Sequence, residues 1–213
     1  MEIYSMKKSG KKSAKSEDRI HRIMQVTHEQ ILAVGLRNIT LRSIARQCAI
    51  HLKTLQHYFP TKNDLLKAIY QDIIDDYLPP LTEILHLPED PMPRFNRVLD
   101  ELFRFVDDLN NQRFFIEIFS MAQNDDEWMQ LLDQKFFAFY NRIGDLLAEL
   151  NPDLNRKEGR KRALAMGAMM EGMMLFLGDN KPVRPERENL AEEIRGLLVL
   201  MATAPKIADN LEK

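Results

Sequence analysis

Apolar residues recur at intervals of three and four positions along most of the chain, and alternating runs rich in Val, Ile and Thr are absent. Between residues 94 and 109 the apolar positions are Phe95, Val98, Leu99, Leu102, Phe103, Val106 and Leu109. This spacing is typical of an amphipathic helix. The pattern predicts an all-α fold with about nine helices, over residues 17–34, 41–47, 52–58, 62–77, 94–109, 112–122, 125–150, 156–177 and 186–203.

Capping residues and prolines mark where these helices begin and end. Side chains that can cap a helix N-terminus precede three of the predicted helices, at Ser16, Thr40 and Thr61. Gly35 suits the left-handed backbone that often ends a helix. Pro79-Pro80 is expected to end the fourth helix, since proline lacks the backbone N–H that a helix interior requires. The predicted organisation is a flexible basic arm over 1–16, one helical domain over 17–78 and a second over 79–213.

The net charge of −2 hides an uneven distribution along the chain. Residues 1–62 contain twelve basic and four acidic residues, which gives +8, and the remainder therefore carries −10. Such asymmetry suggests a module for nucleic acid or another anionic surface, joined to a domain with a different task. The first fifteen residues contain five lysines, for which the sequence leaves two roles open. They add DNA affinity through counterion release, or they only keep a tail soluble.

The second and third predicted helices are short, are joined by a tight turn and follow a longer first helix, which is the helix-turn-helix arrangement. The inward positions are apolar, as that packing requires: Ile44, Ala45, Ile50 and Leu55. Polar residues at the predicted outer face of the third helix can reach base edges: Lys53, Thr54, Gln56 and His57. Thr40, Tyr58 and Lys62 lie at helix ends, where they suit phosphate groups.

Residues 44–62, Ile-Ala-Arg-Gln-Cys-Ala-Ile-His-Leu-Lys-Thr-Leu-Gln-His-Tyr-Phe-Pro-Thr-Lys, resemble the signature of TetR-type transcriptional regulators. Gly35, Thr40 and Arg42 upstream and Leu65-Leu66 downstream fall at matching intervals. The close resemblance covers residues 18–78. It implies a DNA-binding head in which Arg42 joins the contacts named above. It also implies a C-terminal domain that binds a ligand and dimerises.

Five residues depart from the usual pattern of this family, and two of them, Leu52 and Lys53, stand where Lys and a small residue are common. Ala49 stands where the turn commonly has glycine, so the turn is either slightly strained or of another geometry. His51 replaces the usual Ser or Thr cap of the recognition helix, and Gln56 replaces a common aromatic residue. These changes leave the fold standing and leave the operator sequence unpredicted.

The second domain is rich in Phe and Met, which can fill a core or line an adaptable apolar pocket. The candidate pocket residues are Phe95, Leu99, Leu102, Phe103, Phe115, Phe119, Trp128, Phe136, Met166, Met170 and Met173. Small residues interrupt the segment 163–177, so helices 156–177 and 186–203 are expected to form a homodimer through a four-helix bundle. Glu171 within this segment is either a polar anchor of the pocket or an exposed position.

We therefore predict a dimeric, sequence-specific repressor that a small, largely apolar ligand releases from a palindromic operator in double-stranded DNA. The alternatives are a TetR-like protein that recruits or controls a protein partner without an inducer, and an activator. An enzyme is not expected, because phosphate-loop, dinucleotide and nucleophile-elbow motifs are absent, and His28-Glu29 lacks the second histidine of a zinc helix. No catalytic residue, cofactor, metal or membrane association is predicted. The single cysteine, Cys48, favours a reducing cytoplasm.

Overall fold

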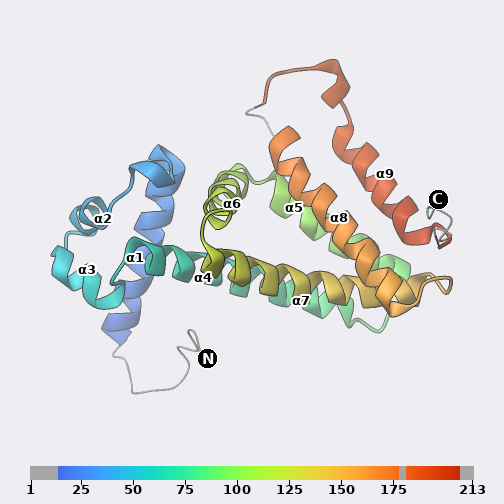
Figure 1. The fold of residues 1–213 in the computed structure, drawn as a ribbon, viewed down its shortest axis with the longest axis horizontal. Helices are drawn as coiled ribbons and strands as arrows, with labels where there is room; N and C mark the ends of the chain where they lie inside the picture. Colours follow the sequence, from blue (N-terminus) through green and yellow to red (C-terminus); the bar gives the residue numbers. More distant parts are fainter. Residues whose placement is uncertain (1–13, 178–180, 207–213) are drawn as a thin grey trace. The chain divides into compact units, whose positions relative to one another are not determined.

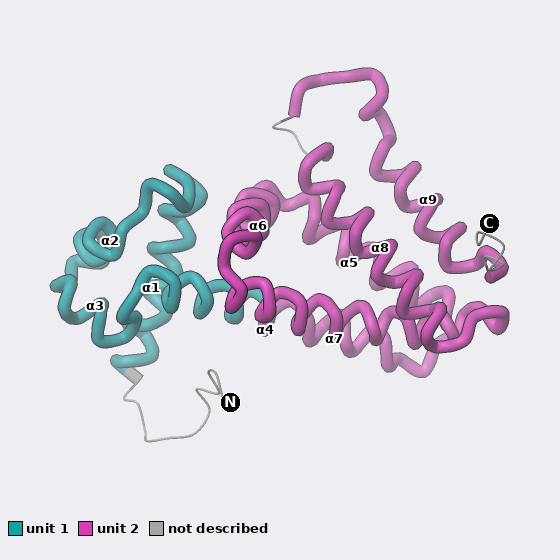
Figure 2. The backbone as a smooth tube through the Cα atoms, in the orientation of Figure 1, with its two compact units in different colours: residues 1–74 teal, residues 75–213 magenta. Residues whose placement is uncertain are grey.

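The computed structural model describes residues 14–177 and 181–206, and all the regular structure within them is helical. Nine α-helices and two short 3-10 helices follow one another along these residues (Figure 1). The predicted all-α fold is therefore confirmed. Two compact units divide the chain, at residues 1–74 and 75–213 (Figure 2). None of the described helices is long and apolar enough to cross a membrane.

The N-terminal unit contains α1 (Ala14–Val34), η1 (Leu36–Asn38), α2 (Leu41–Gln47), α3 (Leu52–Tyr58) and the first half of α4 (Lys62–Leu85). Its core joins all four α-helices through residues that are at most 2% exposed, among them Ile23, Ile44, Leu55 and Leu65. The predicted bounds of α2 and α3 are confirmed to the residue. Between α1 and η1, Gly35 has a φ of 78° and a ψ of 153°, a backbone conformation that glycine adopts at little cost.

The start of α1 differs from the prediction. The helix begins at Ala14, so Ser16 lies inside its first turn and is not the N-cap. Residues 14–16, which were assigned to the flexible arm, are therefore helical. The rest of that arm, residues 1–13, lies outside the described residues.

The predicted end of α4 at Pro79-Pro80 is wrong, because the helix continues through both prolines to Leu85. Each proline removes one helical hydrogen bond, which weakens the helix locally. Beyond them, Leu81 and Leu85 are 1% and 5% exposed, so packing of the last turns in the second unit stabilises the continuation. The cap predicted at Thr61 is confirmed, since Thr61 Oγ1 accepts from Asp64 N–H at 3.1 Å, and the Asp64 carboxylate accepts in return from Thr61 N–H at 2.9 Å.

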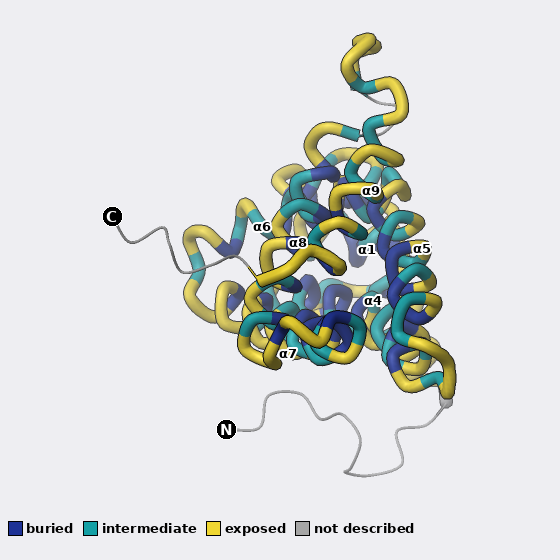
Figure 3. Tube along the Cα trace, turned by 90° about the vertical axis from the view of Figure 1, so that its right-hand side faces the viewer, coloured by how far each residue is buried: buried dark blue, intermediate teal, exposed yellow. Residues whose placement is uncertain are grey.

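The second unit adds α5 (Pro91–Asp107), α6 (Leu109–Ala122), α7 (Asp126–Leu150), α8 (Arg156–Phe176), η2 (Pro185–Arg187) and α9 (Leu190–Thr203). Buried and exposed positions alternate along α5 and α7, as expected of amphipathic helices (Figure 3). Arg94 on α5 is 8% exposed, donates to the Leu85 carbonyl and pairs with Glu149 of α7. The last helix begins four residues later than predicted, because residues 185–187 form the separate turn η2.

Helices α7 and α8 approach closely at glycine positions. A β-carbon on Gly167 would lie 2.5 Å from Cζ of the Tyr140 ring, and one on Gly144 would overlap the backbone of Arg160. Gly167 belongs to the segment 163–177, which the sequence assigns to the dimer interface, yet it is buried against α7 of its own chain. By contrast, an added β-carbon on Gly172 would meet nothing within 4 Å.

Helix α9 is held to the rest of the second unit by polar side chains. Arg162 on α8 donates to the carbonyl oxygens of Met201 and Ala204, at 2.6 and 2.7 Å. Arg195 on α9 pairs with Asp100 of α5 at 2.8 Å. These contacts fix the C-terminal helix so that some of its apolar residues point outward, including Leu197 and Leu200, which are 43% and 63% exposed.

Candidate nucleic-acid interface

The turn between α2 and α3 sets how the two helices cross. Ala49 has a φ of 53°, so it adopts the left-handed conformation that glycine usually supplies. Ile50 N–H closes the turn on the Ala45 carbonyl at 3.0 Å. Of the two geometries left open by the sequence, the structure has the strained one. A left-handed alanine costs about 1 kcal/mol, which the buried Ile44 and Leu55 on either side must offset.

The N-terminus of α2 is capped as predicted. Thr40 Oγ1 accepts from Ser43 N–H at 3.1 Å, and Ser43 Oγ accepts from Thr40 N–H at 3.0 Å. Both Thr40 and Arg42 are exposed. A capped helix end with an exposed hydroxyl and a guanidinium beside it suits contact with a phosphate.

Helix α3 has one apolar side and one polar side. Leu55 is fully buried, whereas Lys53, Gln56 and His57 are exposed. Thr54 and Tyr58 are half-buried, and the His57 and Tyr58 rings meet edge to face with centroids 5.3 Å apart. The helix therefore presents amine, amide and imidazole groups to solvent, which can pair with base edges in a major groove.

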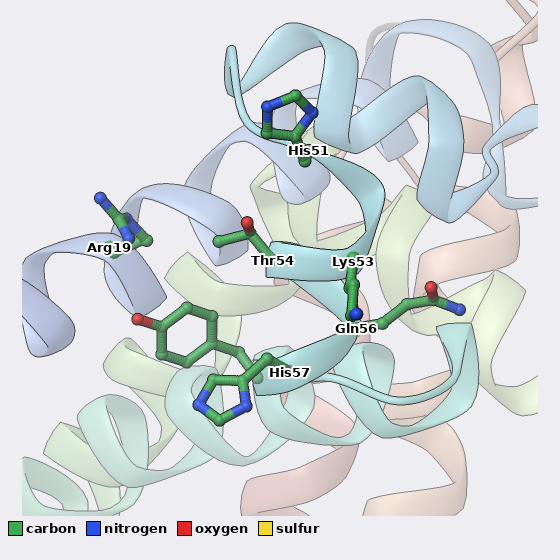
Figure 4. Close-up of a pocket in the computed structure, with 7 residues that line it drawn as sticks. Arg19, His51, Lys53, Thr54, Gln56 and His57 are labelled. Atoms are coloured by element: carbon green, nitrogen blue, oxygen red, sulfur yellow. The ribbon is translucent and has the colours of Figure 1, made fainter.

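A shallow concave surface runs along this polar side. It is lined by Arg19, His51, Lys53, Thr54, Gln56, His57 and Tyr58 (Figure 4). Five of these residues were predicted DNA contacts, and all of those five lie on α3. Arg19 and His51 were not predicted. Arg19 comes from the first turns of α1, where only the general excess of basic residues could have indicated it. His51 is the N-cap position of α3, without a side-chain capping hydrogen bond.

Lys62 is placed differently from the other predicted DNA contacts. Its Nζ donates to the carbonyl oxygens of Leu36 and Ile39, at 2.5 and 3.0 Å, and so ties the start of α4 to the segment after α1. The ammonium thus satisfies backbone acceptors of the head itself. Cys48, in the helix-turn-helix turn, is a half-buried thiol, and burial raises its pKa. A raised pKa reduces the reactive thiolate, so Cys48 fits a packing role.

The candidate pocket residues of the second unit divide into two groups. Seven of them are at most 4% exposed and belong to the core between the helices: Phe95, Leu99, Phe115, Trp128, Met166, Met170 and Met173. Leu102 is 7% exposed, while Phe103, Phe119 and Phe136 are half-buried. Phe103 contacts the guanidinium of Arg195, 5.9 Å from its ring centroid.

Phe115, Phe119 and Phe136 belong to a continuous array of rings. Neighbouring centroids lie 4.0 to 6.2 Å apart along the series Tyr77, Phe105, Phe115, Phe119, Phe136 and Tyr140. We call these six residues the ring array. Tyr77, Phe105 and Tyr140 were not predicted. Phe105 lies outside the main apolar stripe of its helix. An aromatic residue in that position was the one feature of the sequence that could have indicated a further aromatic contact.

Glu171 lies at one end of the ring array. Its Oε1 accepts from the Tyr140 hydroxyl at 3.4 Å, and its Oε2 is buried without a hydrogen-bond partner among the described residues. Burial raises the pKa of Glu171 to about 7. Burial and the charge of Glu171 together raise the pKa of Tyr140 well above its ordinary value. Of the two readings of Glu171, the exposed position is wrong, because the residue is half-buried and its Oε2 is closed off from solvent.

The described residues contain no group of three or more His, Cys, Asp or Glu side chains arranged to hold a metal ion. The polar groups of the N-terminal unit converge instead on the outer side of α3. The chemistry available there is hydrogen bonding and charge pairing with an extended anionic partner.

Known proteins resemble both units. The sequence profile of the bacterial regulatory proteins of the tetR family matches residues 23–69. The HTH-type transcriptional regulator BetI of Escherichia coli O17:K52:H18 is 24% identical over 159 residues, which are 74% of this chain and 80% of BetI. BetI of Escherichia coli K12 is 22% identical over 179 residues, covering 80% and 88%.

Solved structures share the fold at lower identity. A TetR transcription regulator from Haloarcula marismortui matches with a TM-score of 0.72 and 17% identity, over 87% of this chain and 97% of that one. A transcriptional regulator from Saccharomonospora viridis, solved in complex with choline, matches with a TM-score of 0.70 and 16% identity, over 86% and 94%. These relatives are regulators and not enzymes. The helix-turn-helix geometry, the family match and the shared fold together make this chain a member of the TetR family of transcriptional regulators.

Proposed function

We propose that this protein is a dimeric repressor that binds a palindromic operator and leaves it when a small ligand enters the second unit. The observation that carries the proposal is the exposed polar side of α3, where Lys53, Gln56 and His57 stand on a helix whose opposite side is anchored by the buried Leu55. A rigid helix with amine, amide and imidazole groups on its outer side is suited to read bases in the major groove.

The dimer is supported by apolar residues on the outer sides of α8 and α9. Leu164, Leu175, Leu197 and Leu200 are between 41% and 63% exposed within one protomer. Exposed leucines on two neighbouring helices favour burial against a second copy. A two-fold dimer would present two α3 helices to two half-sites, which is why we expect a palindrome.

Release by a ligand is supported by the ring array and by the relatives. One structural neighbour was solved with choline, and a ketosteroid transcriptional regulator, KstR2 of Mycobacterium tuberculosis, shares the fold with a TM-score of 0.60. We propose that this chain likewise takes a small, largely apolar effector in the second unit. The effector must bind the DNA-incompetent state more tightly, because equal affinity for both states would shift nothing. We also propose that the protein is located in the cytoplasm.

The DNA-binding claim is tested with a selected operator. Duplexes chosen from a random library by the wild-type protein would be used to compare it with the variant Lys53→Ala/Gln56→Ala/His57→Ala. We expect specific affinity to fall by about a hundredfold or more, since each base contact contributes about 1–3 kcal/mol. Fluorescence anisotropy at one fixed salt concentration gives the measurement.

The matched control is Lys157→Ala/Gln134→Ala/His86→Ala, which removes the same three residue types from exposed positions of the second unit. It should bind like the wild type. Specific binding that survives in the α3 variant, with helicity and dimer mass unchanged, would refute the assignment. A repressor that controls a protein partner without an inducer would bind the same operator and would ignore every small molecule tested.

A further inference from the structure

Arg19 brings α1 into the concave surface that runs along α3. It lies in the second turn of α1 and lines this surface together with α3 residues such as Lys53 and Thr54 (Figure 4). Both helices belong to the N-terminal unit, so the arrangement lies within one compact body. None of the described residues that line the surface is acidic. The surface therefore combines the guanidinium of one helix with the donors of another.

The guanidinium of Arg19 has no anionic partner within the described part of the chain. Its side chain is half-buried, yet it forms no hydrogen bond or ion pair with another described residue. Of the four positions three and four residues away on α1, two are basic, Lys15 and Arg22, and none is acidic. Like charges at this spacing repel one another. The neighbouring acids Glu17 and Asp18 lie about 160° and 100° away around the helix. An anion that binds at Arg19 would relieve this repulsion.

Arg19 flanks the side of α3 that faces outward. At about 100° per residue, Lys53, Gln56 and His57 fall within a sector of about 100°, and Thr54 falls in the next sector. Figure 4 shows Arg19 beyond Thr54, on the side of the helix away from Gln56. Arg19 therefore lies at the edge of the reading surface and not at its centre.

The edge of a recognition helix meets the sugar–phosphate backbone. A helix with its side chains is about 10–12 Å across, and the major groove of B-DNA is about 12 Å wide. A helix that fills the groove therefore has one DNA strand along each of its sides. When Lys53 and Gln56 face the base edges, the Thr54 side of α3 faces one of these strands, and Arg19 extends that side.

We propose that Arg19 is a further operator contact, whose guanidinium holds a backbone phosphate of the strand along the Thr54 side of α3. This deepens the proposed function, on whose operator binding it rests. A guanidinium can donate two parallel hydrogen bonds to one phosphate, which fixes direction as well as distance. Because Arg19 comes from α1, the contact anchors a second helix of the head to the DNA and fixes the register of α3 without reading a base.

The test compares Arg19→Gln with the wild type on a selected operator and on an unrelated duplex, by fluorescence anisotropy over a range of salt concentrations. Affinity for both duplexes should fall by a similar factor, about tenfold or more. The slope of log affinity against log salt should become shallower by about 2, one phosphate for each head of the dimer. The variant should melt at the same temperature as the wild type or higher, because it relieves the repulsion from Lys15 and Arg22. Arg19→Lys keeps the charge, so it should keep the slope and lose less affinity.

The matched control is Arg37→Gln, which removes the same charge from an exposed position of η1 outside the concave surface. It should lower affinity by less than about threefold and change the slope by less than about one half, since salt screens a charge that makes no contact. A slope that changes equally in the two variants would reduce Arg19 to a general contribution of charge and overturn the proposed contact.

Neutral methylphosphonates at single positions of the operator identify the partner of Arg19. One position in each half-site should weaken binding of the wild type and of Arg37→Gln by about tenfold and leave Arg19→Gln unaffected. Equal sensitivity of the wild type and Arg19→Gln at every position would refute the phosphate contact. A loss in Arg19→Gln that is confined to the operator, with an unchanged slope, would assign Arg19 to a base edge instead. A wild type that selects no operator would refute the proposed function itself, whereas failure at Arg19 alone would leave that function standing.

Discussion

The side chains of Glu171 and Lys62 act through neighbours that lie far from them in the sequence. Lys62 is of a residue type that commonly contacts phosphate, yet its ammonium donates hydrogen bonds to the carbonyls of Leu36 and Ile39. Glu171 is of a residue type that usually lies at the surface, yet it is half-buried beside Tyr140, with its Oε2 closed off from solvent. Ala49 is the opposite case, since its departure from glycine was visible in the sequence and its φ of 53° followed from the turn it occupies.

The buried Glu171 predicts an unusual dependence of stability on pH. Its folded pKa of about 7 lies above the ordinary value of 4.5, so the folded protein keeps the proton longer than the unfolded chain does. Stability contributed by this group therefore falls as pH rises from 4.5 to 7 and is lowest above 7. Glu171→Gln should be more stable than the wild type at pH 8, by at most about 3 kcal/mol, with little difference near pH 4.5.

Urea unfolding at pH 5 and pH 8, at one chain concentration, measures this difference. The control Glu83→Gln removes an exposed carboxyl and should shift both midpoints alike. If Glu171→Gln is no more stable than the wild type at pH 8, the prediction is wrong, and the ionised carboxylate must be stabilised by a partner or by water.

Helices α4 and α8 show how packing overrides local preference. The prolines at 79 and 80 disfavour a continuous helix, and the buried leucines that follow them stabilise its last turns. In α8, the small residues looked like a helix–helix contact between subunits. Gly167 instead admits the Tyr140 ring of its own chain, one turn before Glu171, so the same surface of α8 packs against Tyr140 and accepts its hydroxyl hydrogen bond.

A methyl group at Gly167 should disturb this packing. Gly167→Ala places a carbon 2.5 Å from the Tyr140 ring, so we expect the free energy of unfolding to fall by about 1–3 kcal/mol. Gly172→Ala makes the same change on the same helix, where the added carbon meets nothing within the protomer, and should keep or raise stability by up to about 1 kcal/mol. Thermal or urea unfolding of both variants provides the comparison, and equal stability of the two would contradict the close α7–α8 contact.

The two units differ in charge as well as in fold. Residues 1–62 carry +8 and the remainder carries −10, so phosphates are attracted to the N-terminal unit and repelled by most of the rest. A dimer built through α8 and α9 places its interface in the acidic unit and leaves both basic heads for DNA. The charge distribution and the exposed leucines thus support the same assembly.

The dimer is tested by placing charges on its proposed surface. Leu164→Glu/Leu200→Glu changes two exposed leucines, one on α8 and one on α9. Because of the two-fold axis, each substitution places a charge on both sides of the proposed interface. We expect dissociation to a folded monomer in light scattering and an operator affinity at least about tenfold weaker, because a monomer contacts one half-site. Phe137→Glu, at a 50% exposed position of α7, should remain dimeric. A double variant that stays dimeric would place the interface elsewhere.

The sequence by itself determined the helical class, the bounds of α2 and α3 and the polar side of the recognition helix. Caps such as Thr40 and Asp64 act within three residues, and amphipathic spacing acts within a few turns, so both can be read locally. Only the tertiary structure decided that α4 continues through its prolines, that Lys62 binds backbone, and that rings from four helices form one series that ends at Tyr140, beside Glu171. Those features depend on which surfaces pack together, and no spacing along the chain encodes the contact between Tyr140 and Glu171.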